Sequence, residues 1–181
     1  MLGTFKSDRY SIITDCSWSE YLDTEFPNNL VSFRDGVITI MSPGRNHEII
    51  GDLIRAVIWF YCRRYKIQIF TFNQTRLKAA QKEGKEPDLA YCFGIDKDKP
   101  DLAVEINLTS GSIDDLTKYQ YLNVPEAWIW EQNKIRFFVC RDYGYLELTN
   151  SQFLSGLKSD RVTKIVNESF GKSPLSIEFE V

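Results

Sequence analysis

The sequence predicts a single α/β domain, covering residues 1–181, in which helices pack on a mixed β-sheet. Three observations support this fold class. The chain has 181 residues, of which 43% are hydrophobic, enough for one core without disulfides or a structural metal. Apolar residues recur at helical spacing through residues 46–65, which indicates a long amphipathic helix. Strand-like runs alternate with helical segments on both sides of this helix, as in α/β folds.

A short helix and a β-hairpin are expected before the long helix. Ser17 and Glu20 have the spacing of a capping box, and Pro27 limits the helix that they begin. Asp35-Gly36 is a strong signal for a tight hairpin turn. The two strands that it joins are expected at residues 30–34 and 37–41.

After the long helix, the sequence predicts further strands around a second helix. These strands are expected at residues 66–72, 87–93, 101–108, 127–131, 135–140 and 145–148. Residues 76–85 are polar and predict a loop or a ragged edge. Residues 109–112 offer an N-cap for a helix over residues 113–122. The C-terminal region predicts short helical pieces and a final strand at residues 175–181.

The composition excludes several kinds of catalytic site. His47 is the only histidine, so His-rich metal sites are excluded, and a Ser-His-Asp or Cys-His mechanism would have to use this residue. The four cysteines form no C-x-x-C pair, so neither a zinc knuckle nor a redox pair is expected. Carboxylates, lysines and hard metal ions remain as the main catalytic groups.

Charge and hydropathy limit the partners. The formal net charge of −3 gives no overall attraction to nucleic acid, so a DNA partner would need a local basic patch. The longest uninterrupted apolar run, residues 56–62, is far shorter than a membrane-spanning helix, and no signal segment opens the chain. The sequence therefore predicts no membrane partner and a cytoplasmic location.

Two carboxylates stand out because each belongs to an apolar strand. Asp88 follows Pro87 at the start of one strand, and Glu105 lies within the next, on the face opposite Val104 and Ile106. A partly buried carboxylate is costly unless it is paired, hydrogen-bonded or bound to a cation. If the strands are neighbours, both acids can bind one divalent ion, with the backbone carbonyl of Ile106 as a third oxygen ligand. The alternative is that Asp88 caps a turn and Glu105 faces water or pairs with a lysine.

Several motifs, taken in order, resemble those of one bacterial family. They are the Asp-Gly hairpin, a Ser-Pro followed by a histidine at the long helix, EPDLAY, DLAVE, TSG and NVPEAWIWE, and they run from about residue 17 to residue 150. In these motifs the chain resembles the Uma-two family of restriction endonuclease domains, a branch of the PD-(D/E)XK nuclease superfamily. The resemblance implies a restriction-endonuclease-like α/β/α core with a bent mixed sheet and an N-terminal β-hairpin.

The resemblance also implies a site and an activity. By position, Asp88 and Glu105 would bind Mg²⁺ or Mn²⁺, and the protein would be an endonuclease that hydrolyses DNA phosphodiester bonds. A homodimer is implied because two DNA strands must be cut. His47 matches the helix histidine of the family and is expected near the site, but not as the general base. Glu48 is expected either as a further carboxylate of the site or as an acid that favours the helix N-terminus.

The sequence departs from the family at the lysine of the site. The position two residues after Glu105 holds a lysine in the wider superfamily, and here it is Asn107. The family usually carries its lysine on the following helix, where this sequence has Asp115. Lys118 lies one helical turn later on the same face, so it is expected either to reach back to the site or to form a surface ion pair with a neighbouring acid.

Basic residues before Asp88 are better candidates for contacts with DNA phosphates than Arg63, Arg64 and Lys66 at the end of the long helix. They lie in the polar stretch that leads to this acid: Arg76, Lys78, Lys82 and Lys85. Phosphate contacts of this kind give salt-sensitive affinity without base specificity. The ordinary alternative is a solubilising loop.

Aromatic residues at strand spacing near the C-terminal half have a packing interpretation. Trp128 and Trp130 alternate along one strand, and Phe137 and Phe138 lie in the next. This arrangement favours a role in the core or in a dimer interface over a platform for base stacking.

Two functions follow from the sequence. The first is a Mg²⁺-dependent or Mn²⁺-dependent endonuclease with Asp88, Glu105 and Lys118 as its catalytic residues. The second is a catalytically degenerate nuclease fold that serves as a DNA-binding or protein-interaction module. Asn107 and Asp115, at the two lysine positions, favour the second function.

Overall fold

Two β-sheets and four α-helices make up the computed structural model, which describes residues 8–72, 75–79, 83–108, 112–142 and 144–178. The strands are β1 (Arg9–Ile13), β2 (Leu30–Arg34), β3 (Val37–Ser42), β4 (Ile69–Thr71), β5 (Leu77–Ala79), β6 (Glu83–Lys85), β7 (Leu89–Phe93), β8 (Leu102–Asn107), β9 (Glu126–Glu131), β10 (Lys134–Arg141) and β11 (Gly144–Leu148). The helices are α1 (Trp18–Asp23), α2 (Arg45–Tyr65), α3 (Ser112–Tyr121) and α4 (Ser159–Ser169), and a short 3-10 helix, η1, follows at Pro174–Ser176.

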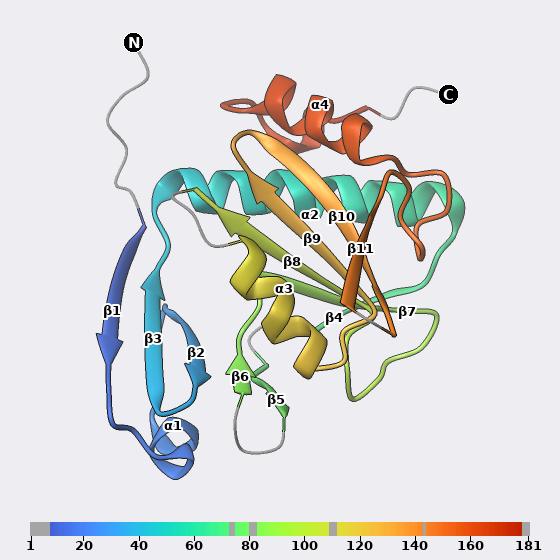
Figure 1. Cartoon of the computed structure of the whole chain (residues 1–181). Coiled ribbons are helices and arrows are strands. Elements are labelled where there is room, and N and C mark those ends of the chain that lie inside the picture. The colour runs from blue at the N-terminus through green and yellow to red at the C-terminus, as the bar shows by residue number, and fades with distance from the viewer. Residues whose placement is uncertain (1–7, 73–74, 80–82, 109–111, 143, 179–181) are drawn as a thin grey trace.

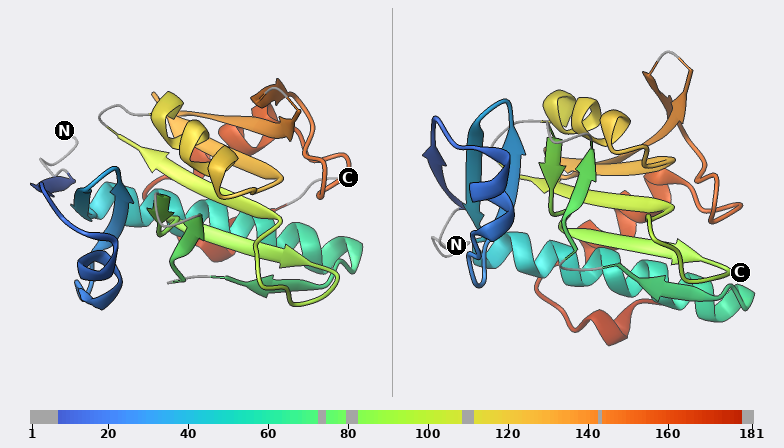
Figure 2. Two further views of the ribbon diagram at one scale, coloured as in Figure 1. Left: turned by 60° about the horizontal axis from the view of Figure 1, so that its bottom comes forward. Right: turned by 90° about the horizontal axis from the view of Figure 1, so that it is seen from below.

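The larger sheet is the central layer of an α/β/α arrangement (Figure 1). Its strand order is β11-β10-β9-β8-β7-β4, in which β8 and β9 are parallel and the other neighbours are antiparallel. Helices α2 and α4 cover one face of this sheet and α3 covers the other (Figure 2). The predicted α/β fold class with a mixed sheet is confirmed.

The smaller sheet lies beside the N-terminal end of α2 and has the order β1-β3-β2-β6-β5, antiparallel throughout. Its β2–β3 hairpin is the predicted one, and Asp35 and Gly36 have φ angles of 47° and 84°. Positive φ at both turn residues matches the twist of the flanking strands. The predicted capping box of Ser17 and Glu20 is also present at the start of α1.

Helix α2 buries the apolar face that its spacing predicts. Ile54, Val57 and Ile58 are each 0% exposed and pack against the larger sheet. Trp128 of β9 and Phe137 of β10 lie in the same core, with their rings stacked at a centroid distance of 4.1 Å. The packing interpretation of these aromatic residues is therefore confirmed. No described helix combines the length and hydropathy that crossing a bilayer requires.

Of the two alternatives predicted for residues 76–85, the loop is wrong, whereas an edge agrees with β5, the last strand of the smaller sheet. This stretch supplies β5 and β6, which pair with each other, and β6 also pairs with β2. The strand pattern is hidden in the sequence because the polar side chains of β6 are buried in ion pairs, such as that of Glu83 with Arg34. The sequence does not predict β1 either, since its five residues are all exposed and show no alternation.

Two predictions near helix ends have different outcomes. Residues 174–176 form the 3-10 helix η1, not the start of a final strand, because the side chain of Ser173 accepts a hydrogen bond from the N–H of Leu175 and caps a turn. Of the segment expected to supply the N-cap, residues 109–112, the first three lie outside the described residues, and α3 is seen from Ser112 onward.

Gly84 in β6 is packed directly against Tyr21, which is 0% exposed. A Cβ atom at position 84 would lie 2.4–2.6 Å from ring and hydroxyl atoms of Tyr21. Gly84→Ala is therefore expected to lower the free energy of unfolding by about 1–3 kcal/mol, because either the ring or the strand must shift. Urea denaturation measures this loss.

The matched control is Lys78→Ala on the paired strand, where Lys78 lies opposite Gly84 and is exposed. This change is expected to stay within about 0.5 kcal/mol. Equal unfolding free energies for wild type and Gly84→Ala would show that the contact with Tyr21 is not tight.

Candidate active site

Strands β7 and β8 bring the two predicted acids to the same place. They pair antiparallel with Leu89 opposite Val104, so Asp88 lies beside Glu105 and Ile106. Oδ2 of Asp88 accepts a 2.6 Å hydrogen bond from the backbone N–H of Ile106. Because the N–H and C=O groups of one strand residue point to the same edge, the carbonyl of Ile106 is directed to the Asp88 edge as well.

The carboxylate of Asp88 is buried and only partly satisfied. Its side chain is 3% exposed, and Nε2 of His47 lies 3.2 Å from Oδ2. Its other oxygen, Oδ1, is buried without a hydrogen-bond partner among the described residues. A buried, unpartnered carboxylate oxygen is costly, and a cation is a natural partner for it.

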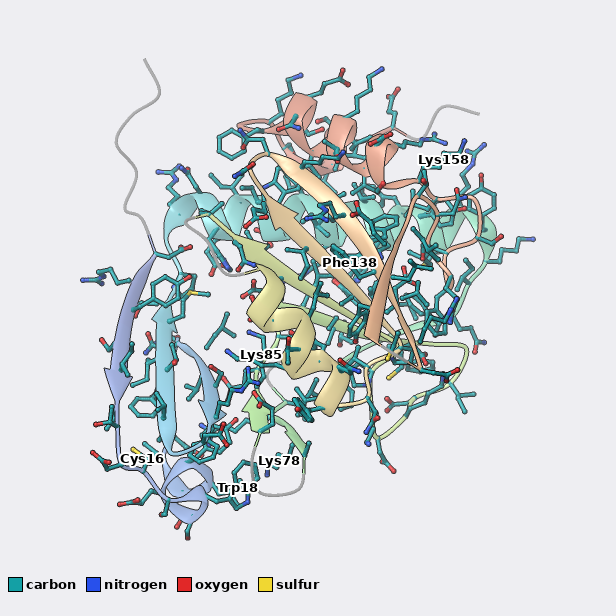
Figure 3. All side chains as sticks on the ribbon, in the orientation of Figure 1. Cys16, Trp18, Lys78, Lys85, Phe138 and Lys158 are labelled. Atoms are coloured by element: carbon teal, nitrogen blue, oxygen red, sulfur yellow. The ribbon has the colours of Figure 1, made fainter. Side chains whose placement is uncertain are left out.

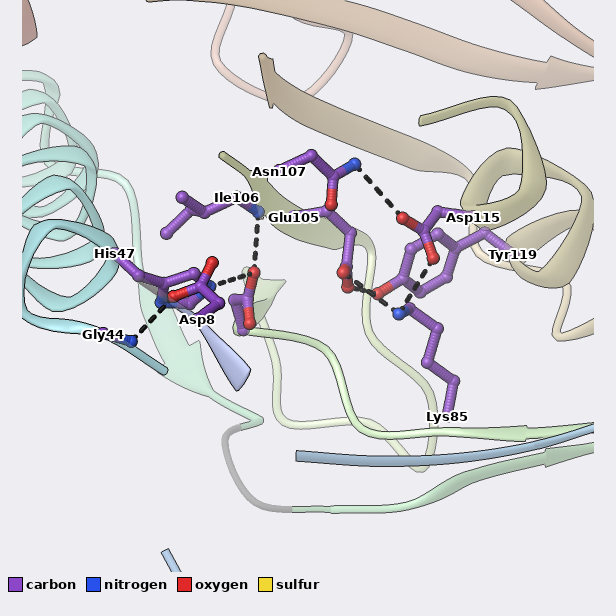
Figure 4. A network of polar contacts seen from close by, with 10 residues as sticks. Asp8, Gly44, His47, Lys85, Glu105, Ile106, Asn107, Asp115 and Tyr119 are labelled. Carbon is purple, nitrogen blue, oxygen red and sulfur yellow. Dashed lines mark hydrogen bonds and ion pairs between the residues drawn. The ribbon is translucent and has the colours of Figure 1, made fainter. Parts of the chain in front are cut away.

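His47 is held at the start of α2 beside a second buried acid. Asp8 accepts a 2.7 Å hydrogen bond from the backbone N–H of Gly44, the residue before the helix (Figure 4). Burial alone would lower the pKa of His47, but Asp88, Asp8 and Glu48 together raise it above its ordinary value. Glu48 itself is exposed and lines a cleft next to the site.

Glu105 is buried in β8 and is contacted from two other elements. The hydroxyl of Tyr119, on α3, donates to Oε1, and Nζ of Lys85, on β6, lies 3.0 Å from Oε2. Tyr119 is 0% exposed, and Lys85 is 8% exposed. The smaller sheet and α3 therefore both contribute to the position of this carboxylate.

Lys85 also contacts Asp115. Asp115 and Asn107 occupy the two positions where the family resemblance leads us to expect a lysine. Nζ of Lys85 lies 3.0 Å from Oδ1 of Asp115, and Oδ2 of Asp115 accepts a 3.2 Å hydrogen bond from Nδ2 of Asn107 (Figure 4). Figure 3 shows Lys85 beside α3, between the two sheets. A continuous polar network thus runs from β8 through α3 to β6 and back to β8.

The ionisable groups of this network have pKa values that are shifted in different directions. Burial, together with the carboxylates of Asp88 and Asp115, raises the pKa of Glu105 to about 8 against the opposing effect of Lys85. Burial alone would lower the pKa of Lys85, but Asp115 and Glu105 raise it well above its ordinary value. The pKa of Asp115 is lowered, because Lys85 and Lys118 outweigh the effect of burial. Lys85 and Asp115 therefore form an ionised pair, and Glu105 is the acid that an added cation would stabilise.

Two cavities meet at Asp88. A cleft of about 890 Å³ includes Asp88, His47, Glu48 and Ile106 in its lining. A smaller pocket of about 180 Å³ is lined by the charged network: Lys85, Asp88, Glu105, Asp115 and Lys118. The carboxylates of the site and both amines are therefore next to space that a substrate could enter.

Lys118 lies at the smaller pocket rather than on an open surface. Burial lowers its pKa, and the nearby Lys85 amine lowers it further, while Asp115 and Glu105 oppose this shift. Of the two expectations for Lys118, its position agrees with the one in which the side chain turns towards the site.

Of the basic residues expected to contact DNA, those that the structure describes do not form one exposed patch. Arg76 is paired with Glu86 at 2.6 Å and donates to the backbone carbonyls of Tyr21 and Thr24, so it ties the smaller sheet to α1. Lys85 is enclosed in the site, whereas Lys78 is exposed on β5. Lys82 lies outside the described residues.

The oxygen donors near Asp88 have the chemistry that a hard divalent ion prefers. Within residues 8–72, 75–79, 83–108, 112–142 and 144–178, no three His, Cys, Asp or Glu side chains are grouped as metal ligands. Asp88, Glu105 and the carbonyl of Ile106 are the oxygen donors that could hold such an ion, and Oδ1 of Asp88 has no competing hydrogen bond from the described chain. Each carboxylate oxygen of Glu105 already accepts one contact, and a carboxylate can accept several.

Comparisons with known proteins place the chain in a family and show its fold. The family model Uma2, described as "Putative restriction endonuclease", matches residues 18–168. The chain belongs to the Uma2 family. All candidate site residues from His47 to Lys118 lie within the Uma2 match.

A solved structure shows that the Uma2 chain has a known fold. It is similar to the crystal structure of a protein from Anabaena variabilis ATCC 29413 titled a "putative nuclease belonging to DUF820", with a TM-score of 0.59 and 11% sequence identity. The similarity covers 83% of this Uma2 chain and 98% of that chain. A comparison with curated proteins finds no match.

Sequence reasoning missed the positions of Lys85 and Tyr119 in the Uma2 site. Tyr119 lies four residues after Asp115 on the same helix face, so helical spacing contains a signal for it. Lys85 reaches the site from the smaller sheet, and spacing along the chain contains no signal for this contact because it depends on how the two sheets meet.

Proposed function

We propose that this Uma2 protein is a divalent-metal-dependent endonuclease that hydrolyses DNA phosphodiester bonds. The observation that carries the proposal is the buried Oδ1 of Asp88, which has no hydrogen-bond partner in the described structure and lies beside Glu105 and Ile106. Family membership supports nuclease chemistry, and the family resemblance supports Mg²⁺ or Mn²⁺ as the ion. DNA rather than another phosphodiester is proposed because the family is described by restriction activity.

Each residue of the site has a proposed task. Asp88, Glu105 and the carbonyl of Ile106 would hold the ion. A divalent ion in this place supplies Lewis acidity, which polarises a phosphate oxygen, lowers the pKa of water and offsets charge in the transition state.

The surrounding contacts keep these donors in place. The N–H of Ile106 and the imidazole of His47 orient the carboxylate of Asp88, while Tyr119 orients that of Glu105. Lys118 would add positive charge at the smaller pocket, where a phosphate group enters.

A homodimer is part of the proposal, since two copies of the site can act on the two strands of a duplex. Light scattering on the protein eluting from a sizing column measures this state. A protein mass near twice 21.1 kDa supports it, and a complex with duplex DNA that contains a single 21.1 kDa protein contradicts it.

A second function is favoured by the ion pair of Lys85 with Glu105. An internal ammonium already compensates part of the carboxylate charge, and Asn107 and Asp115 replace the expected lysines. The alternative is a catalytically degenerate nuclease fold that binds DNA or protein without cleaving.

Supercoiled plasmid separates the two functions. The wild-type protein is expected to convert it to nicked and linear forms with Mg²⁺ or Mn²⁺, and not with EDTA. Glu105→Gln, purified by the same procedure, is the control for contaminating nucleases and is expected to be inactive. Binding of plasmid without cleavage in either metal would favour the degenerate fold, and cleavage that survives EDTA or Glu105→Gln would exclude this site as its source.

A further inference from the structure

We propose that Lys85 is the catalytic amine of this site, presented by β6 and positioned by Asp115. In this arrangement the one N–H of the amine that Glu105 and Asp115 leave available donates to the scissile phosphate. The inference rests on the proposed nuclease function and deepens it, because it names the group that replaces a lysine on β8 or on α3.

The position of the amine supports this role. Nζ of Lys85 lies 3.0 Å from Oε2 of Glu105, a proposed metal ligand, and the side chain lines the same pocket as Asp88. If Glu105 holds an ion, the amine would lie on the same side of the pocket as that ion. It would then donate to a phosphate oxygen that enters the pocket.

The donors of the amine are sufficient for this task. An ammonium has three N–H groups and no acceptor. The contacts with Glu105 and Asp115 use two of them in the described structure, and the side chain faces the smaller pocket. The third N–H is thus available for a ligand in that pocket.

The backbone under Lys85 is fixed on both sides. In the smaller sheet, Lys85 is paired with Ser32 of β2 and with Leu77 of β5. A side chain that starts from the middle strand of three is held more precisely than one on a loop, as a catalytic group requires.

The two departures from the family pattern are explained by the same network. Asn107 donates to Asp115, and Asp115 accepts from Lys85 (Figure 4). The residues at the two expected lysine positions therefore form a chain that ends on one lysine from another strand. This is the arrangement expected if Lys85 on β6 supplies the positive charge of the site and the carboxylate of Asp115 on α3 orients it.

Two double variants at positions 85 and 115 test the proposal. Lys85→Met/Asp115→Asn removes both charges with little change in volume, and the amide oxygen introduced on α3 can still accept from Asn107. Its single-turnover rate of plasmid or duplex cleavage is expected to fall by about 10²–10³-fold. Calorimetric Mn²⁺ affinity and the melting temperature are expected to stay near wild type, since the metal ligands are intact; a purely structural role would lower them.

A second double variant places the amine on α3 and is expected to regain activity. Lys85→Ala/Asp115→Lys leaves room for a lysine that reaches Glu105 from α3, and it is expected to recover at least about tenfold of the lost rate. Lys172→Met removes an exposed lysine beyond α4 and is the control expected to cleave at the wild-type rate.

Failure of the proposed function and failure of the proposed role of Lys85 give different results. If the wild type does not cleave with Mg²⁺ or Mn²⁺, the proposed function fails and Lys85 has no catalytic role. If the wild type cleaves and Lys85→Met/Asp115→Asn cleaves within about threefold of it, the site stands and the role of Lys85 is refuted. A variant with tighter Mn²⁺ binding and faster cleavage also refutes it, because the ammonium would then compete with the metal.

If Lys85→Met/Asp115→Asn does not fold, Lys85→Arg tests the same proposal. It retains the charge and the ion pairs but moves the donors, so the rate is expected to fall at least about tenfold with unchanged Mn²⁺ affinity. A wild-type rate for Lys85→Arg overturns the proposal.

Discussion

Asp88→Asn is expected to lower Mg²⁺-dependent cleavage of DNA by at least about 10³-fold, equivalent to about 4 kcal/mol of transition-state stabilisation. The reason is the loss of charge at Oδ1, the buried oxygen that has no hydrogen-bond partner in the described chain. The substitution preserves an acceptor for the N–H of Ile106, so the local backbone is expected to stay in place. Initial rates on plasmid at saturating Mg²⁺ measure the effect.

Stability separates this effect from misfolding. The charges of Asp88 and Asp115 raise the pKa of Glu105, so these three acids disfavour one another's ionisation, and removing the charge of Asp88 is expected to leave the melting temperature in EDTA unchanged or slightly raised. In Mg²⁺ the wild type is expected to gain stability and Asp88→Asn to gain none. Cleavage by Asp88→Asn at a rate close to that of the wild type would be inconsistent with metal binding by this acid.

Trp128→Ala is expected to lower the free energy of unfolding by about 3–5 kcal/mol. Trp128 is 0% exposed, stacks on Phe137 at a centroid distance of 4.1 Å, and donates a 2.6 Å hydrogen bond from its indole N–H to Glu126. Its removal leaves a cavity under α2 and takes one donor from a buried carboxylate. Denaturation in urea gives the magnitude.

Tyr121→Ala is the matched aromatic control, because Tyr121 is 60% exposed at the end of α3. It is expected to change stability by no more than about 0.5 kcal/mol. If Trp128→Ala were as stable as Tyr121→Ala but bound DNA more weakly, Trp128 would be a base-stacking residue and not a core residue.

The predictable parts of the fold are those with a local physical signal. The capping box at Ser17, the Asp35-Gly36 turn and the apolar face of α2 each depend on neighbouring residues, and each is present. β6 escapes prediction because its polar side chains are buried in ion pairs with other strands. Glu83 pairs with Arg34 of the neighbouring β2, and Lys85 pairs with Glu105 where the two sheets meet. β1 escapes prediction because both of its faces are exposed.

The same distinction applies to the site. Asp88 and Glu105 could be paired from sequence because antiparallel neighbours bring residues 88 and 105 together. The contacts of Glu105 with Lys85 and of Asp115 with Asn107 could not, since they join three elements whose relative placement is a property of the packed structure. A lysine that the sequence assigns to a DNA-contacting loop thus lies at the centre of the charged network.

Anomalous diffraction from crystals of the wild-type protein grown with Mn²⁺ tests the central claim that Asp88 and Glu105 share one catalytic ion. A single peak is predicted within about 2.0–2.3 Å of a carboxylate oxygen of each residue and of the carbonyl oxygen of Ile106. A peak elsewhere, or none at a Mn²⁺ concentration that supports cleavage, would contradict the proposed site.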